Sequence, residues 1–521
     1  MKKKFVRIIA VLCCIIMAFS GCGLKGKNGG CADNSTRSLT HKISEEPLEL
    51  TFFQSGAYVK QEQNIYSVAF DRTNVNLIFT AGDNITDFSQ AMSLAIASKD
   101  LADILYAGGT TKINEYAKME ILVPLNDLID QYAPNYKKFL EENPDVRQYT
   151  TSPDGNIYWI PKVFELEPQA GWFIRQDWLK KLGLNEPDTV DDFYNTLVAF
   201  KTKDPNGNGK ADEVPYFSGQ TDPVGVVNDF TGLFDARTTF RYENGKVTYG
   251  PLEPEFKQMM ITIAKWYKEG LIDKEVFTRT KQREYFLGND LGGVTHNWFV
   301  STASYNGTFK DTVPGLEFKA FPPPTNSKGI KMETSKRQKY TGEGWAISIA
   351  NEHPVETIKY FDYWWSEEGQ RDATWGVEGV TYNMVDGQPQ FTDLILKSVD
   401  VTPMQLLNEY RDVSCFGQYV LGGAELALAH PYAREGMDLY MDNGYYPVEN
   451  VYLTYTEEEN IARSKYAGQI KTYLAETIQN WILGNSDVEA TYGNFVKELK
   501  SLGVDEYIAI EQAAYKRSLG N

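Results

Sequence analysis

The segment from Leu48 to Tyr106 constrains the fold most, because strand and helix patterns alternate along it. Leu48 to Phe53 alternates in hydropathy as a half-buried strand does, and Val75 to Thr80 makes a second strand. An amphipathic helix is predicted from Ile85 to Ser98, and Leu101 to Tyr106 reads as the next strand. This order is typical of a βαβ unit with a largely parallel sheet, so we predict an α/β protein.

Ligands of such sheets meet the loops that follow the strand ends. Gln54, Ser55, Gly108 and Gly109 come directly after predicted strands. They are therefore candidate ligand-binding residues by position.

The length of the chain predicts more than one core. Of 521 residues, about 475 are left for folding once the N-terminal leader and linker are set aside, and this is too many for a single core. We place crossings between two lobes near Glu165, near Gly344 and near residue 400. Lobe 1 is then residues 48–165 plus 345–400, and lobe 2 is residues 166–344 plus 401–521.

The N-terminus has the pattern of a secretory signal, predicted over residues 1–21. Four basic residues precede an apolar run, Ile8 to Phe19, that is too short to span a membrane as a helix. Phe19-Ser-Gly-Cys22 resembles the bacterial lipobox, which implies cleavage before Cys22 and its lipidation (palmitate). The alternative is ordinary secretion with Cys22 unmodified. Residues 22–47 are polar and Gly-rich, so we expect a flexible tether.

The charge of the chain argues against nucleic acid as a partner. The formal net charge is -18, and it becomes -22 when the four basic residues of the signal leave. Two of the five cysteines leave as well. A disulfide between the remaining Cys31 and Cys415 is not expected, because the tether around Cys31 is not packed.

The stretch Lys203 to Tyr216 has the oxygen spacing of a calcium loop. Acidic and amide side chains alternate, a glycine follows at the sixth place for a sharp turn, and the seventh residue offers its carbonyl. An EF-hand is excluded because its twelfth place is Pro215. The alternative is an ordinary surface turn. The predicted ligands of a structural calcium ion are Asp204, Asn206, Asn208, Lys210, Asp212 and Glu213.

Several segments taken together resemble extracellular solute-binding protein family 1, the substrate-binding lipoproteins of carbohydrate ABC transporters. These segments are Ile174 to Gly183, Asp204 to Glu213, Tyr249 to Phe256, Lys268 to Asp273, Gly376 to Tyr382 and Leu499 to Tyr507. The resemblance implies a two-lobed type 2 periplasmic-binding-protein fold, with a hinge and a central ligand cleft. It implies capture of a carbohydrate, expected to be an oligosaccharide, and its delivery to a membrane permease. The calcium loop is also a feature of relatives that bind acidic oligosaccharides.

Aromatic residues make up 13% of the chain, and sugar rings bind flat apolar faces beside polar edges. Trp172, Trp298, Trp345 and Tyr382 lie at predicted strand ends, at the hinge or in a turn, so each is a candidate stacking platform. Core packing is the alternative for all four. The candidate polar ligands are Gln54, Arg175, Asn297 and Glu378; Arg175 can instead pair with Asp177, and Glu378 can instead cap local structure.

The sequence carries none of the common catalytic motifs. We find no Gly-x-Ser-x-Gly elbow, no His-Glu-x-x-His and no phosphate-binding P-loop, and the four histidines are scattered, with a structural role expected for His296. We therefore predict a non-enzymatic, monomeric binding protein, lipid-anchored at the extracellular face of a bacterial membrane. Two alternatives stay open: a secreted polysaccharide-degrading enzyme, and a peptide-binding receptor of the same fold.

Overall fold

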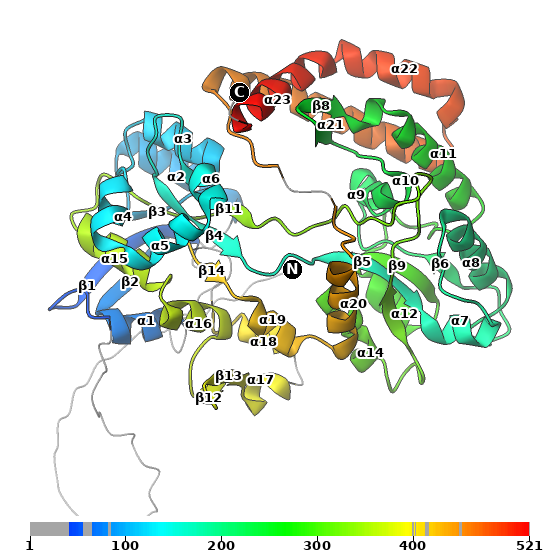
Figure 1. Cartoon of the computed structure of the whole chain (residues 1–521), viewed down its shortest axis with the longest axis horizontal. Coiled ribbons are helices and arrows are strands. Elements are labelled where there is room, and N and C mark those ends of the chain that lie inside the picture. Colours follow the sequence, from blue (N-terminus) through cyan, green and yellow to red (C-terminus); the bar gives the residue numbers. More distant parts are fainter. Residues whose placement is uncertain are drawn as a thin grey trace, which may run out of the picture. The chain divides into compact units, whose positions relative to one another are not determined.

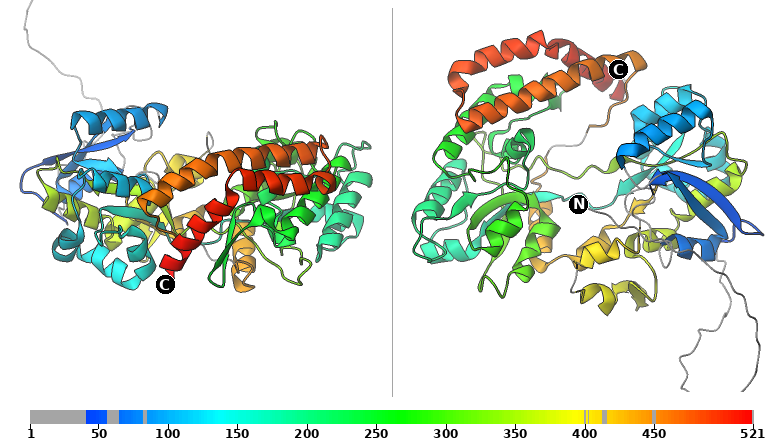
Figure 2. Two further views of the ribbon diagram at one scale, coloured as in Figure 1. Left: turned by 90° about the horizontal axis from the view of Figure 1, so that it is seen from above. Right: turned by 180° about the vertical axis from the view of Figure 1, so that it is seen from behind.

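The computed structural model describes residues 41–55, 65–81, 85–398, 401, 403–411, 416–447 and 451–519. These residues form two α/β lobes, each built on its own sheet (Figures 1 and 2). The predicted signal peptide, Cys22, Cys31 and Cys415 lie outside the described residues.

Lobe 1 is built on a six-stranded sheet with the order β14-β4-β11-β3-β1-β2. Its strands are β1 (Leu48–Ser55), β2 (Val75–Ala81), β3 (Ile104–Tyr106), β4 (Trp159–Phe164), β11 (Tyr340–Ile347) and β14 (Tyr419–Val420). The strands β1, β2 and β3 are parallel, as predicted, whereas β11 runs antiparallel to β3 and β4 because it enters from lobe 2.

Both faces of this sheet are covered by helices, and the side chains of β11 alternate between the two cores. Trp345 and Ile347 belong to one core, and Ala346 belongs to the other. The helices are α1 (Ile65–Thr73), α2 (Ile85–Ser98), α3 (Thr110–Lys118), α4 (Asn126–Tyr132), α5 (Pro134–Glu142), α6 (Pro144–Thr150), α15 (Pro354–Tyr363) and α16 (Glu367–Trp375). The bounds of α2 match the sequence prediction.

Lobe 2 contains a four-stranded sheet with the order β10-β5-β9-β6. Its strands are β5 (Ala170–Arg175), β6 (Val214–Tyr216), β9 (Gly292–Trp298) and β10 (Phe318–Phe321). Only β6 and β9 pair in parallel, whereas β5 runs antiparallel to both β9 and β10. The strand β5 alternates as a buried strand should: Trp172 and Ile174 face one core, and Phe173 faces the other.

Helices and a β-hairpin surround the lobe 2 sheet. They are α7 (Gln176–Leu182), α8 (Val190–Thr202), α9 (Pro223–Asn228), α10 (Thr231–Phe234), β7 (Phe240–Glu243), β8 (Lys246–Tyr249), the 3-10 helix η2 (Gly250–Leu252), α11 (Pro254–Lys268), α12 (Gln282–Gly288), α13 (Phe299–Ala303), α14 (Tyr305–Thr308) and α20 (Pro431–Asp442). The C-terminal helices α21 (Glu457–Leu483), α22 (Val488–Ser501) and α23 (Val504–Ser518) pack against α11 and β8, on lobe 2 (Figure 2).

A small third cluster follows α16. It holds the hairpin β12 (Tyr382–Val385) and β13 (Gln388–Phe391) with α17 (Asp393–Leu396), α18 (Pro403–Leu407) and α19 (Gly422–Leu428). Trp375, Tyr382 and Phe391 form its core.

The chain passes between the two sheets at three crossings. The first crossing, between β4 and β5, lies beside Glu165. The second, residues 322–339, ends before β11 and therefore earlier than Gly344. The third lies at residues 421–430 and not near residue 400, because β14 still pairs with β4 in the lobe 1 sheet. This short strand has too little pattern to be found from the sequence.

The predicted tether is wrong at its C-terminal end, because the chain is already docked on lobe 1 at His41. The backbone N–H groups of His41 and Ile43 donate to the carbonyls of Arg72 and Thr73, at 3.2 and 2.9 Å. The His41 Nε2 atom lies 3.1 Å from a Glu368 carboxylate oxygen.

Candidate functional site

The carboxyl ends of three lobe 2 strands lie at one edge of the sheet. The strands β6 and β9 are parallel, and β10 and β9 both run antiparallel to β5, so all three end on the same side. The exposed Gly219 and Gln220 follow β6, and Asn297 and Trp298 end β9. We call this group of four residues the lobe 2 edge.

Trp298 differs from every other tryptophan of the chain. Its exposed fraction is 56%, whereas the other nine of the ten tryptophans are buried. The backbone N–H of Trp298 donates to Asn297 Oδ1 at 2.8 Å, which fixes the turn from β9 into α13. An exposed indole at a fixed strand end is a suitable platform for a sugar ring.

Glycine at position 219 brings the two strand ends together. A Cβ atom at Gly219 would lie 1.8 Å from Asn297 Nδ2, so any other residue would displace the amide. The close approach places the backbone of Gly219 beside the Asn297 amide, which precedes the exposed Trp298 in the chain, and sugar sites combine such polar groups with flat apolar faces.

The corresponding edge of lobe 1 is polar. Gln54 is the second-last residue of β1, while Gly108 and Gly109, with positive φ values of 69° and 92°, lead from β3 into α3. A lysine that the sequence analysis missed, Lys162 on β4, is 4% exposed and forms an ion pair with Glu343 of β11. A lysine within an otherwise apolar strand is the signal that could have found it. The side chain of Ser55 is outside the described residues.

A buried ion triad lies directly before the exposed end of β9. The His296 Nδ1 atom is 3.2 Å from Asp229 Oδ1, and its Nε2 atom is 2.7 Å from Glu333 Oε2. Burial alone would lower the pKa of His296, but the charges of Glu333 and Asp229 and the hydrogen bonds to them raise it to about 10. The imidazole is therefore a cation at neutral pH. Its structural role agrees with the sequence prediction.

The loop at residues 204–213 is ordered by its own side chains. Asp204 accepts hydrogen bonds from the backbone N–H groups of Gly207, Asn208 and Gly209, at 2.9 to 3.1 Å. Glu213 is 6% exposed, and neither of its carboxylate oxygens has a side-chain hydrogen-bond partner. Burial raises the pKa of Glu213, and the charges of Asp204 and Asp212 raise it further.

Within the described ranges, no group of three or more His, Cys, Asp and Glu side chains is arranged to hold a metal. A calcium loop also uses amide and backbone carbonyl oxygens, which such a group does not include. The orphaned carboxylate of Glu213 is the observation that fits a cation at this loop, because an unpaired buried charge is costly.

Known proteins resemble this chain over its whole length. Residues 57–371 match the family of bacterial extracellular solute-binding proteins. The chain belongs to this family. The fructooligosaccharide ABC transporter substrate-binding protein FusA of Streptococcus pneumoniae serotype 4 is 27% identical over 562 aligned positions, covering all of this chain and 99% of FusA.

Solved structures agree with the family assignment. The crystal structure of the alginate-binding protein AlgQ2, without calcium ion, matches with a TM-score of 0.78 and 36% identity over 91% of this chain and 99% of AlgQ2. FusA in complex with kestose matches with a TM-score of 0.72 and 24% identity, covering 91% of this chain and all of FusA, and confirms the two-lobed fold. The predicted family and fold are thus confirmed.

Three of the predicted sugar-binding residues lie in hydrophobic cores and not at an exposed strand end. Trp345 is fully buried, with its ring stacked on Phe361 at a centroid distance of 4.3 Å. Trp172 is 1% exposed and packs against the His296 ring, and the Tyr382 hydroxyl donates to Asp372 at 2.7 Å. These side chains have no free face for a ligand, so the core alternative holds for each.

The two charged residues that were predicted to bind ligand, Arg175 and Glu378, lie in different environments. Arg175 is 1% exposed and pairs with Asp177 and Asp290, with nitrogen to oxygen distances of 2.6 Å to each, so it cannot clamp a uronate. The pairing with Asp177 that the sequence left open is what the structure shows. Glu378 is exposed in the turn before β12, in the small third cluster and not at a sheet edge.

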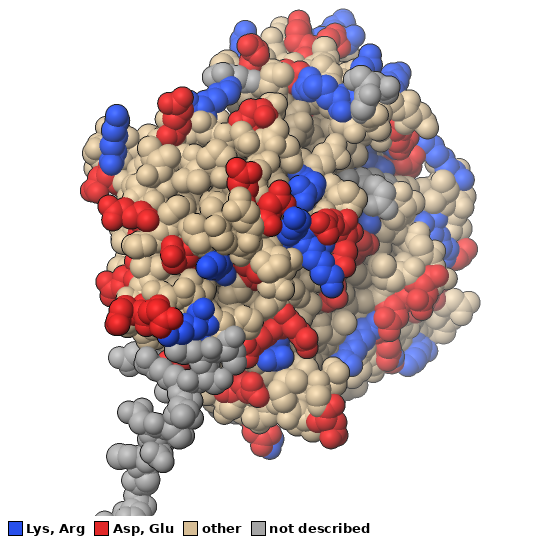
Figure 3. Space-filling view, turned by 60° about the vertical axis from the view of Figure 1, so that its left-hand side comes forward, with Lys and Arg blue, Asp and Glu red and all other residues tan. Residues whose placement is uncertain are grey.

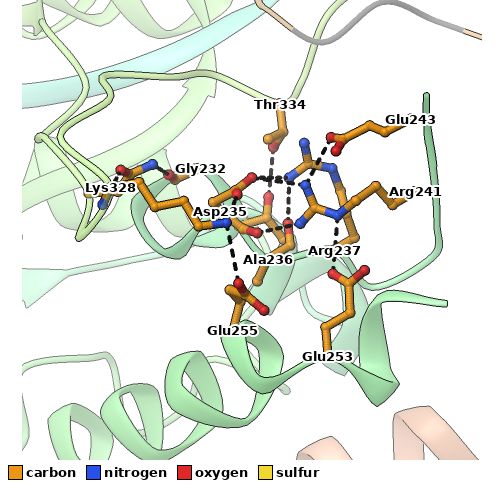
Figure 4. A network of polar contacts seen from close by, with 12 residues as sticks. Gly232, Asp235, Ala236, Arg237, Arg241, Glu243, Glu253, Glu255, Lys328 and Thr334 are labelled. Atoms are coloured by element: carbon orange, nitrogen blue, oxygen red, sulfur yellow. Dashed lines mark hydrogen bonds and ion pairs between the residues drawn. The ribbon is translucent and has the colours of Figure 1, made fainter. Parts of the chain in front are cut away.

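Further cations of lobe 2 are also neutralised locally. Figure 4 shows Arg241 and Lys328 facing Asp235, at 3.1 and 2.5 Å, with Glu253 and Glu255 completing the network. These bonds join the β7–β8 hairpin to the second crossing. On the face shown in Figure 3, acidic and basic side chains are intermixed, without a basic stripe of the kind that binds nucleic acid.

In the part of the chain that the structure describes, none of the helices combines the length and the apolar character needed to span a bilayer.

Proposed function

We propose that this protein binds an oligosaccharide outside the cell and delivers it to the permease of an ABC transporter. The observation that carries the proposal is Trp298, the one exposed indole, which stands at a strand end beside Asn297 and Gly219. The names of the relatives support it, because FusA is a fructooligosaccharide-binding protein and AlgQ2 is an alginate-binding protein.

The proposed site lies between the lobe 2 edge and the edge of the lobe 1 sheet that holds Gln54, Gly108 and Gly109. Asn297 and Trp298 lie on one side of it and Gln54 on the other. The sugar face stacks on Trp298, and hydroxyl groups bond to Asn297, Gln54 and Gln220. The three crossings form the hinge, and binding selects the state in which both lobes contact the ligand. The protein leaves the sugar chemically unchanged.

Titration calorimetry with a panel of oligosaccharides tests this function. We expect saturable binding of one oligosaccharide per chain, with no new products on chromatography after prolonged incubation. Release of shortened sugars would establish the enzyme alternative, and saturable binding of peptides without a response to sugars would establish the peptide receptor.

We also propose that calcium occupies the loop at residues 204–213 as a structural ion. Glu213, Asp204 and Asp212 would supply carboxylate oxygens, Asn206 and Asn208 amide oxygens, and Lys210 its carbonyl. The buried and unpaired Glu213 carboxylate supports this assignment. The ion would neutralise the mutual repulsion of three carboxylates, and it takes no part in contacting the sugar.

The predicted lipid anchor at Cys22 and the predicted monomer remain part of this proposal. Attachment at Cys22 would hold the binding protein at the outer face of the membrane beside its permease. Mass spectrometry of the N-terminal peptide from membrane fractions tests the anchor, and light scattering of the unlipidated chain tests the monomer.

A further inference from the structure

The buried triad of Asp229, His296 and Glu333 joins three segments that are far apart in the sequence. His296 lies on β9, one residue before Asn297 and two before Trp298. Asp229 ends α9, and Glu333 lies within the second crossing between the lobes. His296 thus lies beside the lobe 2 edge in the chain, and its side chain contacts the second crossing through Glu333.

Asp229 extends the network to the other strand of the lobe 2 edge. Its Oδ2 atom accepts from the Tyr216 hydroxyl at 2.6 Å and from the Ser218 hydroxyl at 2.7 Å. The Ser218 oxygen in turn accepts from the backbone N–H of Gln220 at 3.0 Å. The end of β6, with Gly219 and Gln220, is therefore held by the same carboxylate that holds His296.

Glu333 extends the network to the hinge. Its backbone N–H donates to the Tyr445 carbonyl at 2.6 Å, and its Oε1 atom accepts from the Ser335 N–H at 2.6 Å. Further along the same segment, Lys336 pairs with Glu167 of the first crossing at 3.1 Å.

Arg337, next along the segment, binds both carboxylate oxygens of Glu425 in the third crossing, at 2.9 and 2.8 Å. The Glu165 carboxylate accepts from the Gly422 N–H at 2.7 Å, which joins the first and third crossings. All three crossings are thus tied to one another, and Glu333 ties them to His296.

The triad is closed to solvent. His296 and Glu333 are 4% and 3% exposed, and the Trp172 ring covers the imidazole at a centroid distance of 5.1 Å. The charged groups facing the imidazole are Asp229 from α9 and Glu333 from the second crossing, and the Tyr440 hydroxyl of α20 lies near Glu333. Removing one member leaves a buried charge unpaired, so the three groups act together.

We propose that His296 is a positioning residue for the sugar site: it fixes the ends of β6 and β9 to the second crossing, so that the lobe 2 edge and the hinge respond to ligand as one unit. This inference rests on the proposed oligosaccharide-binding function. His296 does not contact the sugar itself. Mutations of this kind, without ligand contact, change coupling between a site and a hinge by about twofold to thirtyfold in affinity.

The state of the imidazole is measured first, by NMR of the four histidines in the intact protein, each assigned by a His→Gln substitution. We expect the His296 signals to show a protonated ring and no titration from about pH 5.5 to 8.5, because both neighbours are carboxylates. His353, which is exposed in lobe 1, serves as the matched control. A His296 ring that titrates near its ordinary pKa would overturn the proposal.

The affinity for the oligosaccharide found by the calorimetric screen is measured next, at a temperature where every variant is folded. His296→Gln should weaken binding by about tenfold, while His353→Gln leaves it unchanged. In Glu333→Gln the imidazole keeps one carboxylate, so its pKa falls, and affinity should decline as pH rises through about 6 to 8 while the wild type stays constant.

The outcomes separate this inference from the function on which it rests. If Trp298→Ala weakens oligosaccharide binding but His296→Gln and Glu333→Gln bind as the wild type does at every pH, the triad is purely structural and the proposal is wrong. If no oligosaccharide binds the wild type, the proposed function fails instead. If His296→Gln does not fold, the dependence of oligosaccharide affinity on pH in Glu333→Gln tests the proposal.

Discussion

Trp345 in lobe 1 and Trp298 in lobe 2 both lie on strands near the crossings, yet only one of them has a free face. Trp345 faces a side of the sheet that α15 covers, and Phe361 lies flat against its ring. Trp298 is the last residue of β9, where the sheet ends and the chain turns into α13. The comparison teaches that the covering helix, and not the residue type or the strand, decides whether an indole is buried in a core or left exposed.

The largest expected effect is on stability, in lobe 1. Trp345→Ala removes a fully buried indole and should lower the free energy of unfolding by about 3 to 5 kcal/mol, measured by urea denaturation. Trp345→Phe should cost much less, because it also removes a buried Nε1–H that has no hydrogen-bond partner. If Trp345→Ala is as stable as the wild type but does not bind sugar, Trp345 belongs to the sugar site and not to the core.

Removal of calcium from the loop at residues 204–213 should have the second-largest effect on stability. Chelation should lower the free energy of unfolding by about 2.7 kcal/mol relative to calcium at a hundredfold excess over its Kd. Glu213→Gln should abolish this difference, while Asp393→Asn on exposed α17 keeps it. Identical melting curves with and without chelator would contradict the calcium assignment.

Trp298→Ala should change affinity instead of stability. Loss of the stacking face should weaken oligosaccharide binding by about 1 to 3 kcal/mol, measured by calorimetry. The melting temperature should stay close to that of the wild type, because the side chain is 56% exposed. A lower melting temperature with unchanged affinity would mean that Trp298 stabilises the fold, as Trp345 does, and does not bind the sugar.

The smallest effect is expected at the hinge. Glu425→Gln disrupts the bidentate ion pair with Arg337. Because this pair is partly exposed, the substitution should lower the free energy of unfolding by about 1 kcal/mol at low salt. High salt should remove most of the difference from the wild type. Asp393→Asn, which breaks the exposed pair with Lys397, is the control and should have no measurable effect. A salt-independent loss at Glu425 would mean that packing, and not charge, holds the crossings together.

Local patterns were sufficient to predict the first strands and the helix α2 of lobe 1. The bounds of α2 and the strands on either side of it follow from the periodicity of apolar residues. The third crossing could not be predicted, because β14 has two residues and is defined only by its pairing with β4. Strand pairing between distant segments leaves no local pattern.

The candidate site was predicted in part, for a related reason. Gln54, Asn297 and Trp298 lie in the last residues of β1 and β9, near the strand ends that the sequence indicated. Whether a tryptophan is covered depends on helices elsewhere in the chain, so Trp172 and Trp345 could not be separated from Trp298 by sequence. The partners of Arg175 and His296 are likewise distant: Asp290 and Glu333 approach them only in the fold.

The accessibility of Trp298 tests the account most directly, because it is the one exposed tryptophan of ten. Acrylamide quenching of tryptophan fluorescence measures it, with Trp298→Ala defining the signal of the nine buried rings. We predict that a saturating oligosaccharide protects the accessible fraction of the wild type and leaves the variant unchanged. If quenching of the wild type is the same with and without bound sugar, Trp298 does not contact the ligand, and the proposed site is wrong.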